Sequence, residues 1–246
     1  MKERSILLRE ADLHRGPLVL INREHPLEGG FHGELAELPR RGQSVLMESR
    51  AAALLEACIQ SVGGAGRIVP VSGWRSRTEQ EQIWADSLRD HGEAFTRSYV
   101  ALPDCSEHQS GLAIDLAKAA EEIDFIRPEF PYDGVCGAFR HSAAKYGFIE
   151  RYREEKRALT GIAAEPWHFR YVGAPHAELM DKHNLCLEEY SPFLRRGEQV
   201  CVLENGKRAR VRYVPWAGTE TEVTVAEDCC QISGDNVGGF IVTIWG

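Results

Sequence analysis

Two short stretches carry the chemistry of this chain: Ser-Glu-His-Gln-Ser-Gly-Leu-Ala-Ile-Asp at residues 106–115 and Glu-Pro-Trp-His at residues 165–168. Residues 113–117 are apolar except for Asp115, which predicts a short strand with a carboxylate in its middle. Such a carboxylate is costly to bury unless a cation lies beside it. His108 precedes Asp115 across Gly111, a residue that permits a sharp bend, and His168 lies on a second expected strand.

These three side chains suggest a metal centre. Two imidazoles and one carboxylate form the protein ligand set of a catalytic zinc, whose fourth position is open to water. We therefore expect one zinc ion per chain on His108, Asp115 and His168. Each histidine taken alone would more often be an ordinary core or surface residue.

Glu165 is the candidate general base. It stands three residues before His168 and directly before Pro166, so we expect it in the turn that leads into the strand. From there its carboxylate would approach a water at the metal without being a ligand, as a general base requires.

Three segments resemble the zinc D,D-peptidases of the VanX, VanY and VanXY type, which belong to the larger lysostaphin, D-Ala-D-Ala metallopeptidase and hedgehog group. They are Ser72-Gly73-Trp74-Arg75-Ser76, the 106–115 motif and Glu165-Pro166-Trp167-His168-Phe169-Arg170-Tyr171-Val172-Gly173. The resemblance covers residues 16–194, and the zincin helix His-Glu-x-x-His is absent from the sequence.

The resemblance implies a fold, an activity and a site. The fold would be α+β, a small antiparallel sheet flanked by helices. The activity would be removal of the last D-Ala from peptidoglycan precursors that end in D-Ala-D-Ala, or splitting of the free dipeptide, as in vancomycin resistance. The implied roles are catalysis by Glu165 and Arg75, zinc binding by His108, Asp115 and His168, and substrate contacts by Gln80, Ser106 and Ser72.

The implied roles of Arg75, Gln80 and Ser106 have simpler alternatives. Arg75 would place a permanent cation at the scissile carbonyl oxygen, where it would stabilise the oxyanion; its alternative is a structural salt bridge. Gln80 could equally be a solvent-facing helix residue, and Ser106 a cap of the turn before His108. Ser72 is small, which favours a longer peptide in the pocket.

Three other functions remain open. The same motifs occur in phage-type endopeptidases that cut L-Ala-D-Glu bonds, and in non-catalytic zinc-binding modules like hedgehog. Glu165 and Arg75 argue against a mere binding module, which needs neither. A purely structural role without metal would require Asp115 and both histidines to find separate partners.

Composition limits the partners and the compartment. The net charge is −8, from 29 basic and 37 acidic residues, which disfavours nucleic acid. The first ten residues carry acids and only a three-residue apolar run, unlike a signal peptide, and no stretch is long enough to span a bilayer. Seven cysteines without regular spacing indicate reduced thiols. We expect a cytoplasmic protein.

The pattern along the chain predicts a catalytic domain over residues 1–196 and a small β-rich extension over 197–246. The expected strands are 16–22, 67–71, 113–117, 148–152, the segment around His168, 199–203, 209–214, 221–225 and 239–245. The expected helices are 44–61, 79–89 with a Thr78–Glu81 capping box, part of 119–130, 134–146, 175–182 and 185–194. Residues 23–41 should be loop, and Asn205-Gly206 a hairpin turn.

Three further expectations follow. Glu107 should be solvated, and so should the helix face that carries His176 and His183. The extension should pack on the catalytic domain or on another subunit, which leaves a homodimer open.

Overall fold

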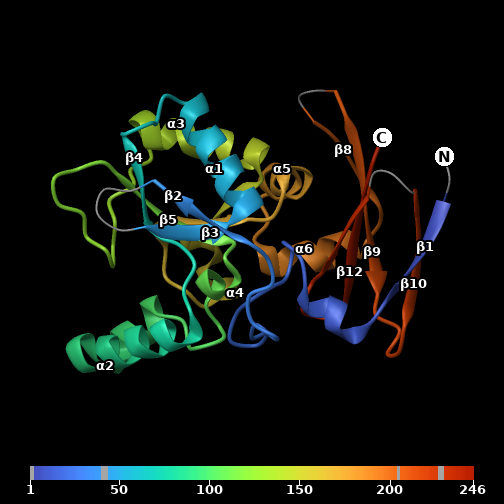
Figure 1. Ribbon diagram of the computed structural model, residues 1–246, viewed down its shortest axis with the longest axis horizontal. Helices are drawn as coiled ribbons and strands as arrows, with labels where there is room; N and C mark the ends of the chain where they lie inside the picture. Colours follow the sequence, from blue (N-terminus) through green and yellow to red (C-terminus); the bar gives the residue numbers. More distant parts are fainter. Residues whose placement is uncertain (1–2, 40–43, 204–205, 227–229) are drawn as a thin grey trace. The chain divides into compact units, whose positions relative to one another are not determined.

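The computed structural model describes residues 3–39, 44–203, 206–226 and 230–246 (Figure 1). The chain divides into two compact units. We call Ile21–Ala177 the central unit, and Met1–Leu20 together with Glu178–Gly246 the terminal unit.

The central unit is built on a four-stranded antiparallel sheet with the strand order β4-β5-β7-β6. Its strands are β4 (Ile68–Ser72), β5 (Ala113–Lys118), β6 (Phe148–Tyr152) and β7 (Glu165–Tyr171). Two further strands, β2 (Leu35–Leu38) and β3 (Val45–Glu48), pair antiparallel. This confirms the expected small antiparallel sheet.

Helices flank this sheet. They are α1 (Ser49–Ser61), α2 (Arg77–Tyr99), α3 (Gly134–Ala143) and α4 (Arg157–Thr160), with short 3-10 turns at η2 (Glu107–Ser110), η3 (Ala144–Tyr146) and η4 (Glu154–Lys156). Helices α1 and α3 lie on one side of the sheet and α2 on the other (Figure 1).

The two faces of β7 have different surroundings. Trp167, Phe169 and Tyr171 pack into the main hydrophobic core with residues of α1 and α3. Phe169 meets Phe139 edge to face, with ring centroids 5.1 Å apart. The alternation of a strand therefore leaves His168 and Arg170 on the opposite face, as predicted.

Helix α1 begins later than predicted. Residues 45–48 form β3, whose alternating burial places Val45 and Met47 in the core. The helix begins at Ser49, and the Glu48 side chain caps it by accepting a hydrogen bond from the Ala51 backbone N–H at 2.8 Å. The partner strand β2 lies within the predicted 23–41 loop, so that prediction was also incomplete.

Helix α2 has a different cap and a different end from those expected. The capping box joins Ser76 and Glu79, because Glu81 instead pairs with Arg77 at 3.0 Å. The helix continues to Tyr99 across a kink at Gly92, whose φ is 81° and ψ 172°.

Two predicted elements are absent from the described residues. The 16–22 segment is irregular, although residues 18–21 are buried. The Leu18 and Leu20 backbone N–H groups bond to Ser233 Oγ and Asp235 O instead of forming a ladder. Residues 119–130 form no helix. The Asp124 side chain there accepts from the Ile126 and Arg127 backbone N–H groups, a local bond that competes with helical pairing.

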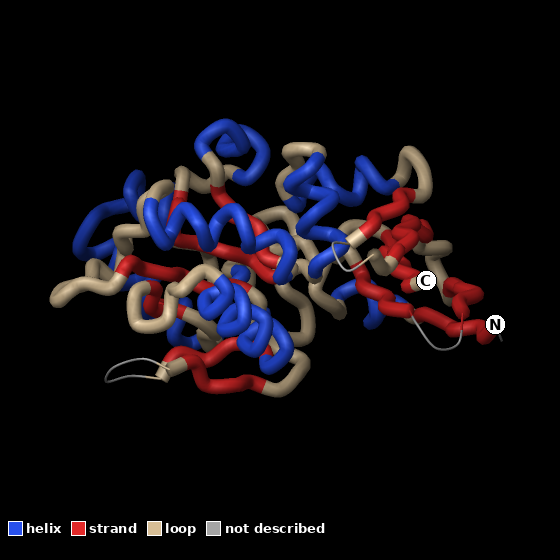
Figure 2. The backbone as a smooth tube through the Cα atoms, turned by 90° about the horizontal axis from the view of Figure 1, so that it is seen from above, coloured by secondary structure: helices blue, strands red, loops and turns tan. Residues whose placement is uncertain are grey.

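The terminal unit is rich in strands, as the red colouring around both chain ends in Figure 2 shows. One sheet pairs β1 (Glu3–Leu8) with β10 (Thr221–Ala226). The other has the order β11-β12-β9-β8. Its strands are β8 (Gln199–Val202), β9 (Arg208–Pro215), β11 (Cys230–Gly234) and β12 (Gly239–Trp245). The helical elements that precede these strands along the chain are the 3-10 turn η1 (Glu10–His14) and the helices α5 (Ala174–Lys182) and α6 (Leu187–Leu194).

The β-rich C-terminal part is therefore confirmed, with β11 added. The pairing of β1 with β10 brings the first residues of the chain to this part, which the predicted division at residue 196 did not include. That division stays a prediction. Asn205 of the predicted hairpin turn lies outside the described residues. Among the described residues, no helix combines the length and the apolarity needed to cross a bilayer.

Candidate metal and active site

Neighbouring strands bring the site residues into one row. The sheet register pairs Ser72 of β4 with Asp115 of β5, and Asp115 with His168 of β7. His108 comes from η2, which ends at Gly111 with a φ of 70°. That left-handed backbone turns the chain from η2 into β5, so the glycine permits the bend that the sequence predicted.

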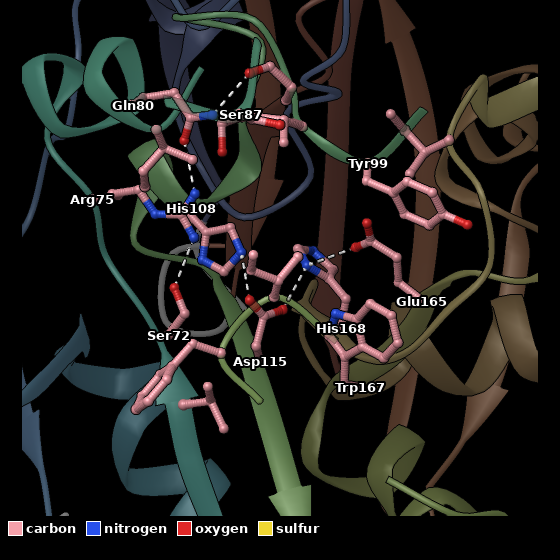
Figure 3. Close-up of a pocket in the computed structure, with 18 of the residues that line it drawn as sticks. Ser72, Arg75, Gln80, Ser87, Tyr99, His108, Asp115, Glu165, Trp167 and His168 are labelled. Atoms are coloured by element: carbon pink, nitrogen blue, oxygen red, sulfur yellow. Dashed lines mark hydrogen bonds and ion pairs between the residues drawn. The ribbon is translucent and has the colours of Figure 1, made fainter. Parts of the chain in front are cut away.

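The three expected ligands meet at one point (Figure 3). Their donor atoms all lie within 4.8 Å of one another, and all three residues are buried. Asp115 lies between the two imidazoles, with Oδ1 at 3.0 Å from His168 Nδ1 and Oδ2 at 3.3 Å from His108 Nε2. Burial alone would raise the pKa of Asp115, but the two histidines outweigh it and hold the pKa well below its usual range.

The remaining ring nitrogens show that this set fits a metal ion. His108 Nδ1 donates to the Gly73 carbonyl at 2.8 Å, which leaves Nε2 as a lone-pair donor. His168 Nε2 lies 3.4 Å from Glu107 Oε2, which leaves Nδ1 of His168 as its lone-pair donor. Two imidazole lone pairs and a carboxylate oxygen thus converge, with the outer nitrogens hydrogen-bonded as in protein metal sites.

Glu165 is the first residue of β7 rather than part of a turn before it. Its Oε2 lies 3.7 Å from His168 Nδ1, beside the ligand cluster but outside it. Burial raises the pKa of its carboxyl to about 8, even though His168 and Arg75 lower it.

Arg75 is held by two residues that the sequence had marked as substrate contacts. Its Nη1 donates to Gln80 Oε1 at 2.9 Å and its Nη2 to Ser72 Oγ at 2.7 Å. Gln80 is itself anchored, because its Nε2 donates to the Ala101 carbonyl at 2.8 Å. Burial lowers the pKa of Arg75, while the nearby carboxylates of Asp115 and Glu165 raise it.

One cavity of about 440 Å³ brings all eight predicted site residues together. Its lining includes the three metal-ligand candidates, Glu165, Arg75, Gln80 and Ser72 (Figure 3). The buried Ser106 lines it as well. It also extends along α2 as far as Phe95 and Tyr99.

Two expectations about charged and titratable residues were wrong. Glu107 is not solvated: its side chain is 0% exposed and paired with Arg151 and Arg170. His176 is buried as well, and burial lowers its pKa to about 3, whereas His183 is exposed as expected. One signal could have pointed to Glu107. Arg170 shares a strand face with His168, and a buried arginine there requires a carboxylate partner.

Comparison with known proteins agrees with this geometry. The family description "VanY: D-alanyl-D-alanine carboxypeptidase" matches residues 44–174. A bifunctional D-Ala-D-Ala dipeptidase and D-Ala-D-Ala carboxypeptidase, VanXYC of Enterococcus gallinarum, is 41% identical over 179 residues, which cover 72% of this chain and 94% of that protein.

Two solved structures are similar as well. The D,D-dipeptidase VanXYg, crystallised with a D-Ala-D-Ala phosphinate analogue, matches with a TM-score of 0.93 and 41% identity over 100% of both chains. A VanY mutant in complex with Zn(II) matches with a TM-score of 0.60 and 27% identity, over 71% of this chain and 98% of the other. Sequence and structure agree, and the chain belongs to the VanY family of D-alanyl-D-alanine carboxypeptidases.

Proposed function

We propose that this protein is a zinc-dependent D,D-peptidase that removes the terminal D-Ala from peptides ending in D-Ala-D-Ala and also splits the free dipeptide. One observation carries the proposal: a three-ligand cluster, the buried Glu165 carboxylate and the half-buried Arg75 guanidinium line the same cavity. The dual activity is supported by the 41% identity to VanXYC, whose name states both activities.

His108, Asp115 and His168 would hold the zinc, one ion per chain. The Zn(II) complex of the VanY relative supports this choice of metal. When bound, zinc supplies a Lewis acid that polarises a carbonyl oxygen and lowers the pKa of a water molecule toward neutrality.

Glu165 would move the proton. Its carboxylate can take a proton from the attacking water and return it to the leaving amine of D-Ala. Burial raises the pKa of this carboxyl, and a group that titrates near neutral pH can both accept and donate a proton at little cost.

Arg75 would bind the scissile carbonyl oxygen. The bonds to Ser72 and Gln80 fix its guanidinium before substrate arrives, so little reorganisation is needed as negative charge develops. In this account Gln80 and Ser72 act mainly through Arg75, and Ser106 remains a candidate for direct contact with the substrate.

The cavity suits a peptide longer than two residues. Its volume of about 440 Å³ falls in the usual range for small-molecule sites, about 300–1,000 Å³. We propose that the part along α2, lined by Phe95 and Tyr99, accepts the residues that precede D-Ala-D-Ala. Free dipeptide and UDP-linked pentapeptide would both be substrates of a cytoplasmic enzyme.

The test is release of D-Ala by the zinc-loaded protein from three substrates in parallel: free D-Ala-D-Ala, UDP-linked pentapeptide and purified cell walls. We expect release from the first two. Solubilised wall fragments without D-Ala release would overturn the proposal in favour of an L-Ala-D-Glu endopeptidase. No cleavage of any substrate by zinc-loaded protein would favour a binding module.

A further inference from the structure

Glu107 lies between the metal-ligand cluster and two buried arginines. Its Oε1 accepts from Arg151 Nε at 2.8 Å and from Arg170 Nη1 at 2.8 Å. Its Oε2 lies 3.4 Å from His168 Nε2. The side chains of Glu107, Arg151 and Arg170 are all 0% exposed, so these contacts are shielded from water.

The two oxygens of this carboxylate have different partners. The guanidinium groups converge on Oε1, and Oε2 faces the imidazole that the cluster uses. A carboxylate in this position accepts a hydrogen bond from Nε2–H, which leaves the lone pair of His168 on Nδ1. Nδ1 is the nitrogen that faces Asp115, at 3.0 Å.

We infer that Glu107 is a positioning residue that accepts a hydrogen bond from His168 Nε2–H and so presents Nδ1 to the metal, and that Arg151 and Arg170 hold the Glu107 carboxylate in place. The inference rests on the proposed zinc site. It assigns a task to three buried charges that the proposed reaction does not use.

The arginines explain how a buried carboxylate can perform this task. The two guanidinium groups supply the opposite charge that a fully buried carboxylate needs, and their bonds to Oε1 fix its orientation. Both arginines come from the sheet that carries His168: Arg151 from β6, and Arg170 from β7 two residues after His168. The geometry of carboxylate and imidazole is thereby tied to the rigid strands.

A purely structural ion-pair cluster would need only the contacts on Oε1. The contact of Oε2 with His168 distinguishes the two interpretations, and Glu107→Gln tests it. The glutamine oxygen would turn to the arginines and its NH₂ group would face Nε2, which opposes a proton on that nitrogen. We expect zinc affinity, measured by chelator competition, to fall about 10- to 100-fold.

A second readout is independent of activity. In zinc-loaded protein, long-range ¹H–¹⁵N spectra should show the His168 Nε2–H proton shifted downfield and protected from exchange by its carboxylate partner. In Glu107→Gln this proton should move upfield and exchange faster. Glu150→Gln is the matched control, because Glu150 is also a carboxylate of this sheet and its hydrogen bonds are to Arg140 and Tyr132 rather than to a metal-ligand candidate.

Removal of the Glu107 charge leaves two buried arginines unbalanced, so the variant could fail to fold. Glu107→Gln combined with Arg151→Met restores the net charge of the cluster. The wild-type cluster has two arginines and one carboxylate, and the double variant has only Arg170, so both carry a single net positive charge. We expect this double variant to fold and to show the same loss of zinc affinity. Arg151→Met alone, which retains Glu107 and Arg170, should keep zinc affinity within about threefold of wild type.

Unchanged zinc affinity and an unchanged Nε2–H signal in a folded Glu107→Gln protein, or in the double variant, would overturn the inference. So would an equal loss of affinity in Glu150→Gln. Failure of the proposed function is distinguishable, because wild-type protein would then bind zinc and show the Nε2–H signal yet release no D-Ala.

Discussion

The Arg75 guanidinium can be tested without disturbing the metal ligands, because its bonds are to Ser72 and Gln80. Arg75→Ala should lower kcat for D-Ala release by about 10²- to 10³-fold, the usual cost of losing an oxyanion donor. Zinc content should remain unchanged. Steady-state kinetics and elemental analysis of the same preparation measure both quantities.

Arg97→Ala is the control for this substitution, since Arg97 is an exposed arginine of α2 paired with Glu93. It should leave kcat within about twofold of wild type. An Arg75→Ala protein that binds zinc and retains more than a tenth of the wild-type kcat would contradict the role of Arg75.

His176 predicts a pH dependence of stability. Burial lowers its pKa to about 3, below the value of about 6.5 for an unfolded histidine. The neutral His176 side chain therefore stabilises the folded state in full above pH 6.5. Its contribution to the free energy of unfolding is lost as the pH falls from 6.5 toward 3. The loss should approach about 1.4 kcal/mol per pH unit.

Urea unfolding of wild type and His176→Gln at pH 7, 6 and 5 measures this contribution. The difference in unfolding free energy between the two proteins should shrink as the pH falls. Equal pH slopes for both proteins would show that His176 does not titrate on unfolding.

Single residues differ in how far their roles could be predicted from the sequence. His108 and Asp115 lie within one short motif, and the strand alternation around His168 identifies its face, so local patterns together with the family resemblance predicted that these three side chains meet. Glu107 was misjudged because its partners Arg151 and Arg170 are 44 and 63 residues away in sequence. A charge pattern says nothing about pairing over that separation.

Among the elements, α2 is interrupted at Gly92. The φ of 81° and ψ of 172° fall in a region that is essentially restricted to glycine. A Cβ at this position would meet no atom within 4 Å, so the cost of Gly92→Ala is purely conformational. We expect a loss of about 1–3 kcal/mol in the free energy of unfolding, measured by denaturant titration.

Gly238→Ala is the control, because Gly238 lies outside the positive-φ region and its nearest added contact would be at 3.7 Å. It should change stability by less than about 1 kcal/mol. A Gly92→Ala protein as stable as wild type would mean that the helix straightens without penalty.

The predicted boundaries of helices were wrong where the sequence allowed two local patterns. Ser76–Glu79 and Thr78–Glu81 both satisfy the capping-box spacing, and the ion pair of Arg77 with Glu81 leaves the first pair to cap the helix. Residues 45–48 were predicted as the start of a helix because Ser44 could cap it and Leu46 belonged to an apolar stripe with Leu54, Leu55, Cys58 and Ile59. The pairing of β3 with β2 decided in favour of a strand.

For the whole molecule, the α+β fold class and the β-rich C-terminal part could be predicted from the sequence, but the pairing of β1 with β10 could not. Those strands are separated by more than 200 residues, and their register is set by the side chains that they bury together, such as Leu8 and Val223 in one hydrophobic cluster. The homodimer stays a prediction that light scattering would test.

We propose that the buried Glu165 carboxylate performs the proton transfers at a zinc site that cleaves D-Ala-D-Ala. D-Ala release and zinc content of Glu165→Gln, measured beside wild type, test this role. We expect one zinc per chain in both proteins and a rate about 10²- to 10⁴-fold lower in the variant. A zinc-loaded variant that releases D-Ala within tenfold of the wild-type rate would contradict it.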